Sequence, residues 1–169
     1  INESNLISFA DEIRKFFNSA SPSSMPTTTH FISQLEIDDK WETSYGSLQI
    51  DERKFPNFAQ TIKRLKDEFN FRTTLWVHPF TNIESSNEFL YMSTNFLAVR
   101  SLDQLHPGLT SWWNGKGSII LDMTNKNSLD YYLNKLKSLK EKYAIDSFKF
   151  DAGKFEKKKI FIFKYIYIY

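Results

Sequence analysis

The chain has 169 residues, of which 41% are hydrophobic and 17% aromatic, and this is enough apolar material for one domain with a packed core. It contains no cysteine, which excludes a disulfide framework, a thiol nucleophile and a thiolate metal site. The net charge of +2 depends on the last residues: without the five lysines and one glutamate of 154–169 it becomes −2, so nothing favours a nucleic-acid-binding protein.

Helical and strand periodicities alternate along the chain. Such alternation favours a parallel sheet whose strands are joined by crossover helices. In chain order, the expected elements are a helix over 5–18, a loop over 19–26, a strand over 31–38, a helix that begins at Pro56, a strand over 72–79, a long irregular excursion over 80–116, a strand over 118–122, a helix capped by Asn125 or Asn127, and a strand over 147–151.

Two architectures fit this order, a doubly wound sheet and a barrel. No glycine-rich phosphate loop follows any expected strand, so the usual nucleotide-binding version of the doubly wound sheet loses support. In a barrel, one face of each strand packs against the helices and the other faces the lumen. Three of the expected strands show that bias, because each has apolar side chains on one face and polar or aromatic groups at the C-terminal end of the other.

Polar or aromatic side chains stand at the C-terminal ends of three expected strands. In a barrel these ends meet at one mouth, where active sites lie. A simpler alternative is that Asp151 caps its strand and pairs with Lys149, and that the other strand ends are merely solvated. The residues concerned are Glu36 and Asp38, Trp76 and His78, and Lys149 and Asp151.

Carboxylates beside tryptophans are typical of a carbohydrate site, because indole rings stack on the apolar face of a sugar and carboxylates bind its hydroxyls. Retaining hydrolysis of a glycosidic bond needs two carboxyl groups about 5–5.5 Å apart. One is the nucleophile and the other is a proton donor with a raised pKa. The neighbouring Lys149 would keep Asp151 ionised, as a nucleophile requires.

Several ordered blocks over residues 5–153 resemble glycoside hydrolase family 31, most closely its myogenesis-regulating glycosidase branch. The resemblance implies a (β/α)8 TIM barrel that cleaves α-glycosides, either α-galactosides or α-glucosides, with retention and without a cofactor. The blocks are Leu35–Glu42, Lys54–Pro56, Thr74–Phe80, Trp112–Gly115, Asp122–Asn125 and Lys149–Gly153.

The resemblance also implies roles for individual residues. Asp151 corresponds to the nucleophile of the strand-four motif, and Lys149 to a lysine that contacts substrate. Glu36 aligns with an acidic residue at the end of strand two that holds hydroxyls of the terminal sugar. The remaining substrate-binding residues that it implies are Asp38, Asp39, Trp76 and Trp113.

Each candidate has a structural alternative. Trp76 could fill the lumen, and Trp112 is expected to pack under the excursion. His78 is expected to be structural, hydrogen-bonded near the end of its strand, and Asp122 to cap the turn at Thr124. With three histidines and no pairing of histidine with carboxylate at helical spacing, no metal site is expected.

The chain departs from the family pattern in three ways. Lys154 stands where the branch has glutamate, and residues 155–169 form an apolar, low-complexity stretch unlike the family. A complete barrel takes about 250 residues. We therefore expect 1–153 to be an incomplete catalytic barrel, running from the first helix to the fourth strand, and 154–169 to be a tail foreign to the family.

The family's acid/base aspartate would lie further along, so this chain alone is expected not to hydrolyse glycosides. The expected partner is a carbohydrate, with no nucleic acid, and the oligomeric state stays open. No run of 18 apolar residues occurs. Relatives in this branch are membrane-anchored with a lumenal catalytic domain, so an anchor would lie outside this chain, which lacks an initiator methionine.

The sequence leaves two other functions open. One is a non-catalytic, carbohydrate-binding or regulatory barrel that has kept the cleft without the chemistry. The other is a structural α/β domain whose polar strand ends are solvated. Whether a later strand supplies a second carboxylate would distinguish an enzyme from the non-catalytic barrel.

Overall fold

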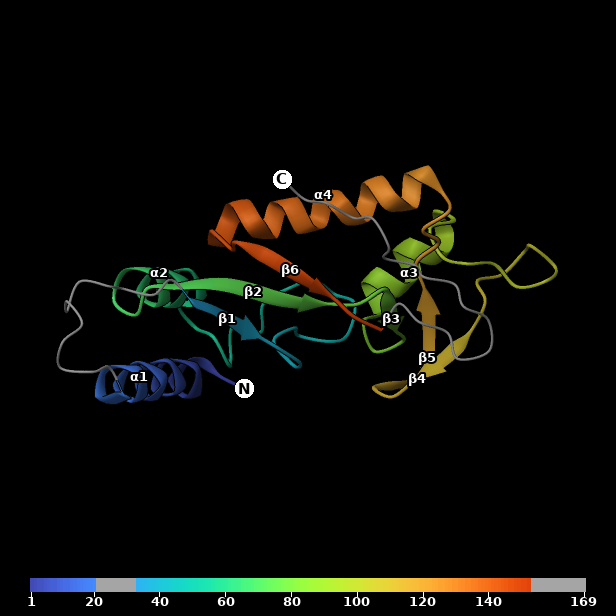
Figure 1. Cartoon of the computed structure of the whole chain (residues 1–169). Coiled ribbons are helices and arrows are strands. Elements are labelled where there is room, and N and C mark those ends of the chain that lie inside the picture. Colours follow the sequence, from blue (N-terminus) through green and yellow to red (C-terminus); the bar gives the residue numbers. More distant parts are fainter. Residues whose placement is uncertain (21–32, 153–169) are drawn as a thin grey trace. The chain divides into compact units, whose positions relative to one another are not determined.

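The computed structural model describes residues 1–20 and 33–152 (Figure 1). The loop expected after the first helix, the beginning of the strand expected at 31–38 and the tail lie largely or wholly outside these residues. The helices are α1 (Glu3–Ala20), α2 (Phe58–Asp67), α3 (Ser86–Thr94) and α4 (Lys126–Tyr143). The strands are β1 (Ser33–Ile37), β2 (Phe71–Val77), β3 (Phe80–Asn82), β4 (Thr110–Trp112), β5 (Gly115–Ile120) and β6 (Ser147–Phe150).

The described residues form two compact units. The first consists of 1–41, 50–76 and 140–149. The second consists of 42–49, 77–139 and the segment from Phe150.

A three-stranded sheet with the order β1-β2-β6 is the centre of the first unit. β1 runs parallel to β2, from Ser33 opposite Phe71 to Ile37 opposite Leu75. The arrow of β6 points the same way on the other side of β2 (Figure 1). The expectation of parallel strands joined by crossover helices is therefore confirmed for these elements.

The central strand β2 is buried on both faces except at Arg72, as strands of a covered parallel sheet are. The two buried threonines of β2 have hydrogen-bond partners in β6 and in Asp146, the residue that precedes β6. Thr73 donates to the Asp146 carboxylate from its backbone nitrogen (2.8 Å) and its hydroxyl (3.2 Å). The Thr74 and Ser147 hydroxyls lie 2.8 Å apart. Polar groups in this core therefore have hydrogen-bond partners, as burial requires.

Helix α1 buries a narrower apolar stripe than its sequence suggests. In α1, Leu6 and Ala10 are buried, whereas Phe9 and Phe17, which share their three- and four-residue spacing, are exposed. α1 is held instead by Arg14, which donates to the carbonyl of Asn70 (2.8 Å) and lies over the Phe71 ring.

The second helix begins later than expected. Asn57 is its N-cap and Phe58 its first residue, so Pro56 precedes the helix rather than opening it. Its buried apolar stripe consists of Phe58, Ile62 and Leu65, at three- and four-residue spacing.

The second unit contains the excursion that was expected to be irregular. It holds a second sheet, antiparallel, with the order β3-β5-β4. It also holds α3, a helix that the sequence did not predict because only Met92 of its nine residues is buried. β5 begins at Gly115 rather than Ser118. α4 begins at Lys126, and the Asn127 backbone nitrogen donates to Asn125 Oδ1 (2.9 Å), so Asn125 is the cap of the two proposed.

No helix within the described parts of the chain is long and apolar enough to cross a membrane.

A buried carboxylate in the first unit predicts a loss of stability in acid. Asp51, which is 1% exposed, accepts hydrogen bonds from Arg53 Nε (2.9 Å) and Nη2 (3.0 Å). The hydrogen bond with the Arg53 side chain outweighs burial and lowers the pKa of Asp51 to about 2, from 3.8. Stability from this carboxylate is complete above the unfolded pKa and is lost as the pH falls from about 4 to about 2.

The expected loss is about 1–2 kcal/mol, discounted because the Arg53 side chain is solvent-exposed. Urea unfolding across this pH range measures it. Asp51→Asn should flatten that pH dependence, whereas Asp130→Asn, at an exposed helical site, should leave it unchanged. An unaltered slope in Asp51→Asn would contradict the assignment.

Candidate functional site

One face of the β1-β2-β6 sheet carries a row of polar side chains. Gln34, Thr74 and Ser147 hydrogen-bond to one another across the three strands, with Gln34 Nε2 lying 3.3 Å from the Ser147 hydroxyl. Because side chains alternate with period two, the residues two positions further along share that face. They are Glu36, Trp76 and Lys149.

An ion-pair cluster forms at this second row. Lys149 Nζ donates to Glu36 Oε1 at 2.6 Å and to Asp38 Oδ2 at 3.1 Å. The hydrogen bond with Glu36, followed by that with Asp38, raises the pKa of Lys149 above its ordinary value. All three side chains are partly exposed, so the cluster presents two acids and one ammonium to solvent.

Asp38 is ionised within this cluster. Partial burial raises the pKa of its carboxyl, but hydrogen bonds with neighbouring groups, Glu36 first among them, outweigh burial, and the pKa lies below its ordinary value. The backbone nitrogen of Asp39 also donates to Asp38 Oδ1 (2.7 Å). Of the predicted residues, the structure therefore brings Glu36, Asp38 and Lys149 into direct contact, with Asp39 adjoining them through its backbone.

Glu36 and Asp38 also line an open groove of about 610 Å³ in the first unit. The opposite wall of the groove is the beginning of α1, including Asn5, Phe9 and Glu12. The groove makes the two carboxylates accessible to a polar ligand.

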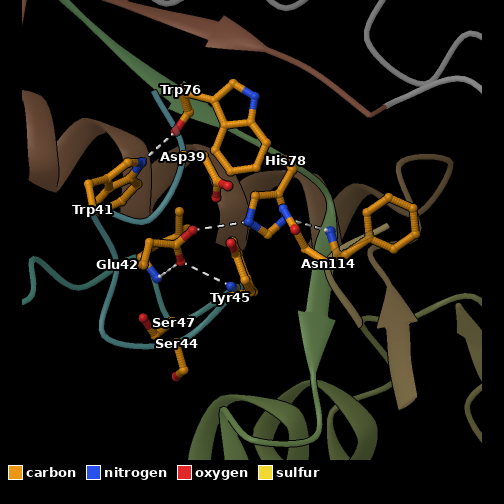
Figure 2. A network of polar contacts seen from close by, with 12 residues as sticks. Asp39, Trp41, Glu42, Ser44, Tyr45, Ser47, Trp76, His78 and Asn114 are labelled. Atoms are coloured by element: carbon orange, nitrogen blue, oxygen red, sulfur yellow. Dashed lines mark hydrogen bonds and ion pairs between the residues drawn. The ribbon is translucent and has the colours of Figure 1, made fainter. Parts of the chain in front are cut away.

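Trp76 is 2% exposed. Its carbonyl accepts a hydrogen bond of 2.7 Å from Nε1 of Trp41, which is itself fully buried (Figure 2). This burial favours the packing alternative for Trp76, and a role in contacting sugar stays a prediction.

Asp151 directly follows β6. Its backbone nitrogen donates to the carbonyl of Val77 (2.9 Å), so the pairing of β6 with β2 extends one residue past the strand. Ala152, at φ 57°, turns the chain and donates its N–H to Asp151 Oδ1 (2.6 Å). The carboxyl group of Asp151 is thus fixed at the C-terminal end of a strand, half-buried.

His78 forms a buried network in the second unit that the sequence predicted only in part. Its Nε2 lies 3.0 Å from Glu42 Oε1, and Glu42 Oε2 accepts the backbone N–H groups of Gly46 (3.0 Å) and Leu48 (2.8 Å), as Figure 2 shows. The Phe80 backbone N–H donates to Nδ1, so Nε2 carries the proton and donates to Glu42. The expectation of a structural, hydrogen-bonded histidine is confirmed.

The two neighbouring tryptophans differ in their surroundings. Trp112 stacks on Phe80 (ring centroids 4.8 Å apart), and its Nε1 donates to Asn82 Oδ1 (2.8 Å). Trp113 is 66% exposed. Trp112 is therefore a packing residue, as expected, and Trp113 offers its indole to solvent.

Sequence reasoning gave no role to Glu42, Asn82 or Trp41. Their hydrogen-bond partners lie 36, 30 and 35 residues away, respectively. No local sequence pattern predicts contacts over such separations. Asp122, by contrast, caps its turn as expected, since its Oδ1 accepts the Thr124 backbone N–H (3.0 Å). The described parts of the chain contain no group of three or more histidines or acidic residues arranged to hold a metal ion.

Comparison with known proteins gives concordant results. Residues 6–163 match the model of the glycosyl hydrolases family 31 TIM-barrel domain. The chain is 39% identical over 154 residues to the mouse protein myogenesis-regulating glycosidase, a match that covers 90% of the chain and 19% of that relative. The chain thus spans about a fifth of the length of the curated protein. The family match extends beyond residue 153, so a domain boundary there stays a prediction.

Solved structures agree on the fold. A glucose-bound dextranase from Flavobacterium johnsoniae has a TM-score of 0.74 at 14% identity, over 90% of this chain and 17% of that one. A xylose-bound α-xylosidase from a soil metagenome has a TM-score of 0.68 at 18% identity, over 90% of this chain and 20% of that one. The expected partial (β/α)8 barrel is confirmed.

Proposed function

Because the chain belongs to glycosyl hydrolase family 31, we propose that it contributes the nucleophile and part of the sugar-binding wall to a retaining α-glycosidase. Asp151 is the proposed nucleophile. The observation that carries the proposal is the cluster of Lys149, Glu36 and Asp38 on the sheet face. Lys149 lies two residues before Asp151 in the sequence. Such a cluster supplies both donors and acceptors for sugar hydroxyls.

In the proposed reaction, an Asp151 oxygen attacks the anomeric carbon while the bond to the glycosidic oxygen breaks. The leaving oxygen takes a proton from a second carboxyl group, which we assign to none of the described residues. Water then attacks the same carbon, breaks the ester to Asp151 and returns its proton to the second carboxylate. Two inversions at one carbon give net retention.

The remaining predicted residues, apart from the buried Trp76, have binding roles in this proposal. Glu36 and Asp38 accept hydrogen bonds from sugar hydroxyls, and Lys149 donates a hydrogen bond to a sugar oxygen while it remains paired with both acids. Asp39 is a further acceptor next to the cluster. The exposed Trp113 offers an indole face for stacking. The proposed substrates are α-galactosides or α-glucosides, which differ at one hydroxyl.

A chimera tests the proposal. Residues 6–152 of this chain replace the matching segment of the mouse relative, and release of nitrophenol from nitrophenyl α-galactoside and α-glucoside is measured beside that of the 169-residue chain. We expect turnover by the chimera only, because the chemistry needs two carboxyl groups.

The first sugar released should be the α anomer, as NMR can follow directly. A folded chimera that is inactive, or that releases the β anomer first, would contradict the proposal. Robust turnover by the 169-residue chain alone would contradict the assignment of the proton donor to another segment.

A further inference from the structure

The turn that carries the exposed Trp113 has a backbone that does not stabilise a hairpin by itself. Trp112 at the end of β4 pairs with Gly115 at the beginning of β5, so Trp113 and Asn114 form a two-residue loop. Favoured loops of this length have a positive φ, because the other turn types splay the two strands. Neither Trp113 nor Asn114 has a positive φ. The turn therefore needs support from another part of the chain.

The buried Asn82, the last residue of β3, supplies that support. Its Oδ1 accepts a hydrogen bond from Trp112 Nε1 (2.8 Å) and another from the Ser118 hydroxyl (2.7 Å). Its Nδ2 donates to the carbonyl of Asn114 (2.9 Å). An indole N–H can only donate and a carbonyl can only accept, so the orientation of the amide is fixed. Asn82 thus binds the residues on both sides of Trp113.

Gly115 allows the amide to come this close to the turn. An added Cβ at Gly115 would lie 2.4 Å from Asn82 Oδ1 and 2.6 Å from its Nδ2. The Asn82 side chain could avoid that clash only by moving away from the groups that it binds. A residue with a side chain at 115 would therefore loosen the contact between Asn82 and the turn.

Trp112, the first of the two anchors, is itself held by packing. Its ring centroid lies 4.8 Å from that of Phe80, 4.6 Å from that of His78 and 5.3 Å from that of Tyr45. The Trp113 ring lies against this group, 5.2 Å from the Trp112 ring, while 66% of the residue stays exposed. An aromatic side chain that is ordered in advance loses less conformational entropy when it binds a ligand.

We propose that Asn82 is a positioning residue, which orders the turn so that the Trp113 indole is ready to stack on a sugar ring. This inference rests on the stacking role of Trp113 in the proposed function. It adds a residue that is only 4% exposed and acts through Trp113 rather than on the sugar.

Asn82→Asp is the most selective substitution. The carboxylate keeps the shape of the amide and can still accept from Trp112 and Ser118. It places an oxygen instead of an N–H group opposite the Asn114 carbonyl, so one anchor of the turn is lost.

The test uses the chimera with the mouse relative and its two nitrophenyl glycosides. KM and kcat are measured, together with the dissociation constant by calorimetry in an Asp151→Asn background. Trp113→Ala should weaken binding about tenfold. Asn82→Asp should weaken it about three- to tenfold and change kcat less than about twofold, because only the order of the stacking surface changes. Added to Trp113→Ala, Asn82→Asp should weaken binding by less than about twofold, since it acts through the missing indole.

A spectroscopic measurement separates positioning from a general loss of structure. In protein labelled with 5-fluorotryptophan, the 19F resonance of Trp113 is assigned from Trp113→Phe. It should shift in Asn82→Asp and in Gly115→Ala, while the resonance of Trp41, buried in the first unit, stays in place. Gly117→Ala, in the same strand as Gly115, is the matched control: the added Cβ meets no atom closer than 3.6 Å and should change neither binding nor the Trp113 resonance.

If Asn82→Asp does not fold, Gly115→Ala serves in its place. Unchanged binding in these variants, or an equal effect of Asn82→Asp with and without Trp113, overturns the inference and leaves the glycosidase proposal standing. Unchanged binding in Trp113→Ala, or binding of neither glycoside, overturns the stacking role of Trp113 and this inference with it. A chimera that binds in the expected pattern without turnover supports the role of Asn82 and contradicts only the assignment of the nucleophile.

Discussion

In the chimera, Asp151→Asn is expected to lower kcat by roughly 10³–10⁶-fold, the range found when a nucleophile is removed from an enzyme that keeps its other groups. The amide cannot form the glycosyl ester. The fold should survive, because the asparagine oxygen can still accept the Ala152 N–H that Asp151 Oδ1 accepts at 2.6 Å. Measuring kcat and KM separately shows whether the chemical step or sugar binding is lost.

Two further measurements distinguish a nucleophile from a structural aspartate. With Asp151→Ala, added azide should restore cleavage and give a β-glycosyl azide, because azide attacks the open face directly and inverts the centre once. Asp122→Asn is the matched control, since Asp122 caps a turn and should leave kcat unchanged within a few-fold. A loss of less than tenfold in Asp151→Asn would remove Asp151 from the reaction.

The sequence predicts the parallel part of the fold well because burial there is periodic. β1 shows the expected alternation, with Leu35 and Ile37 buried and Glu36 exposed. The same alternation brings Glu36 and Lys149 to one face, where they form an ion pair at 2.6 Å. Where one face of a strand is buried and the other is solvated, the period-two alternation of side chains is enough to predict which residues share a face and can form a site.

Prediction is weaker where distant residues decide the structure. α3 buries only Met92, so no apolar stripe marks it. The β4–β5 hairpin is held by Asn82, whose Nδ2 donates to the Asn114 carbonyl (2.9 Å) while its Oδ1 accepts from Ser118 (2.7 Å). An isolated asparagine gives no sign of such contacts. The Glu42–His78 pair is equally hard to predict, because the sequence around each residue gives no sign of the other.

The largest stability effect is expected from Gly46→Ala, in the loop that Glu42 holds. Gly46 has φ +90°, which costs a side-chain-bearing residue about 1–2 kcal/mol. An added Cβ would also lie 2.5 Å from the Phe80 carbonyl oxygen and 2.5 Å from Thr81 Cα, which are backbone atoms that cannot rotate away. Overpacking of this kind costs about 1–3 kcal/mol. The free energy of unfolding should therefore fall by about 2–5 kcal/mol in urea denaturation.

Gly117→Ala is the matched control, because an added Cβ there meets no atom closer than Ile83 Cγ2, at 3.6 Å, and no positive φ is needed. Its effect should stay below about 1 kcal/mol. Equal effects of the two substitutions would show that the close approach of the loop to Phe80 contributes nothing. If Gly46→Ala alone is destabilising, the loop is fixed from two sides: by Glu42, which accepts the Gly46 N–H, and by the backbone of β3, against which only a glycine fits.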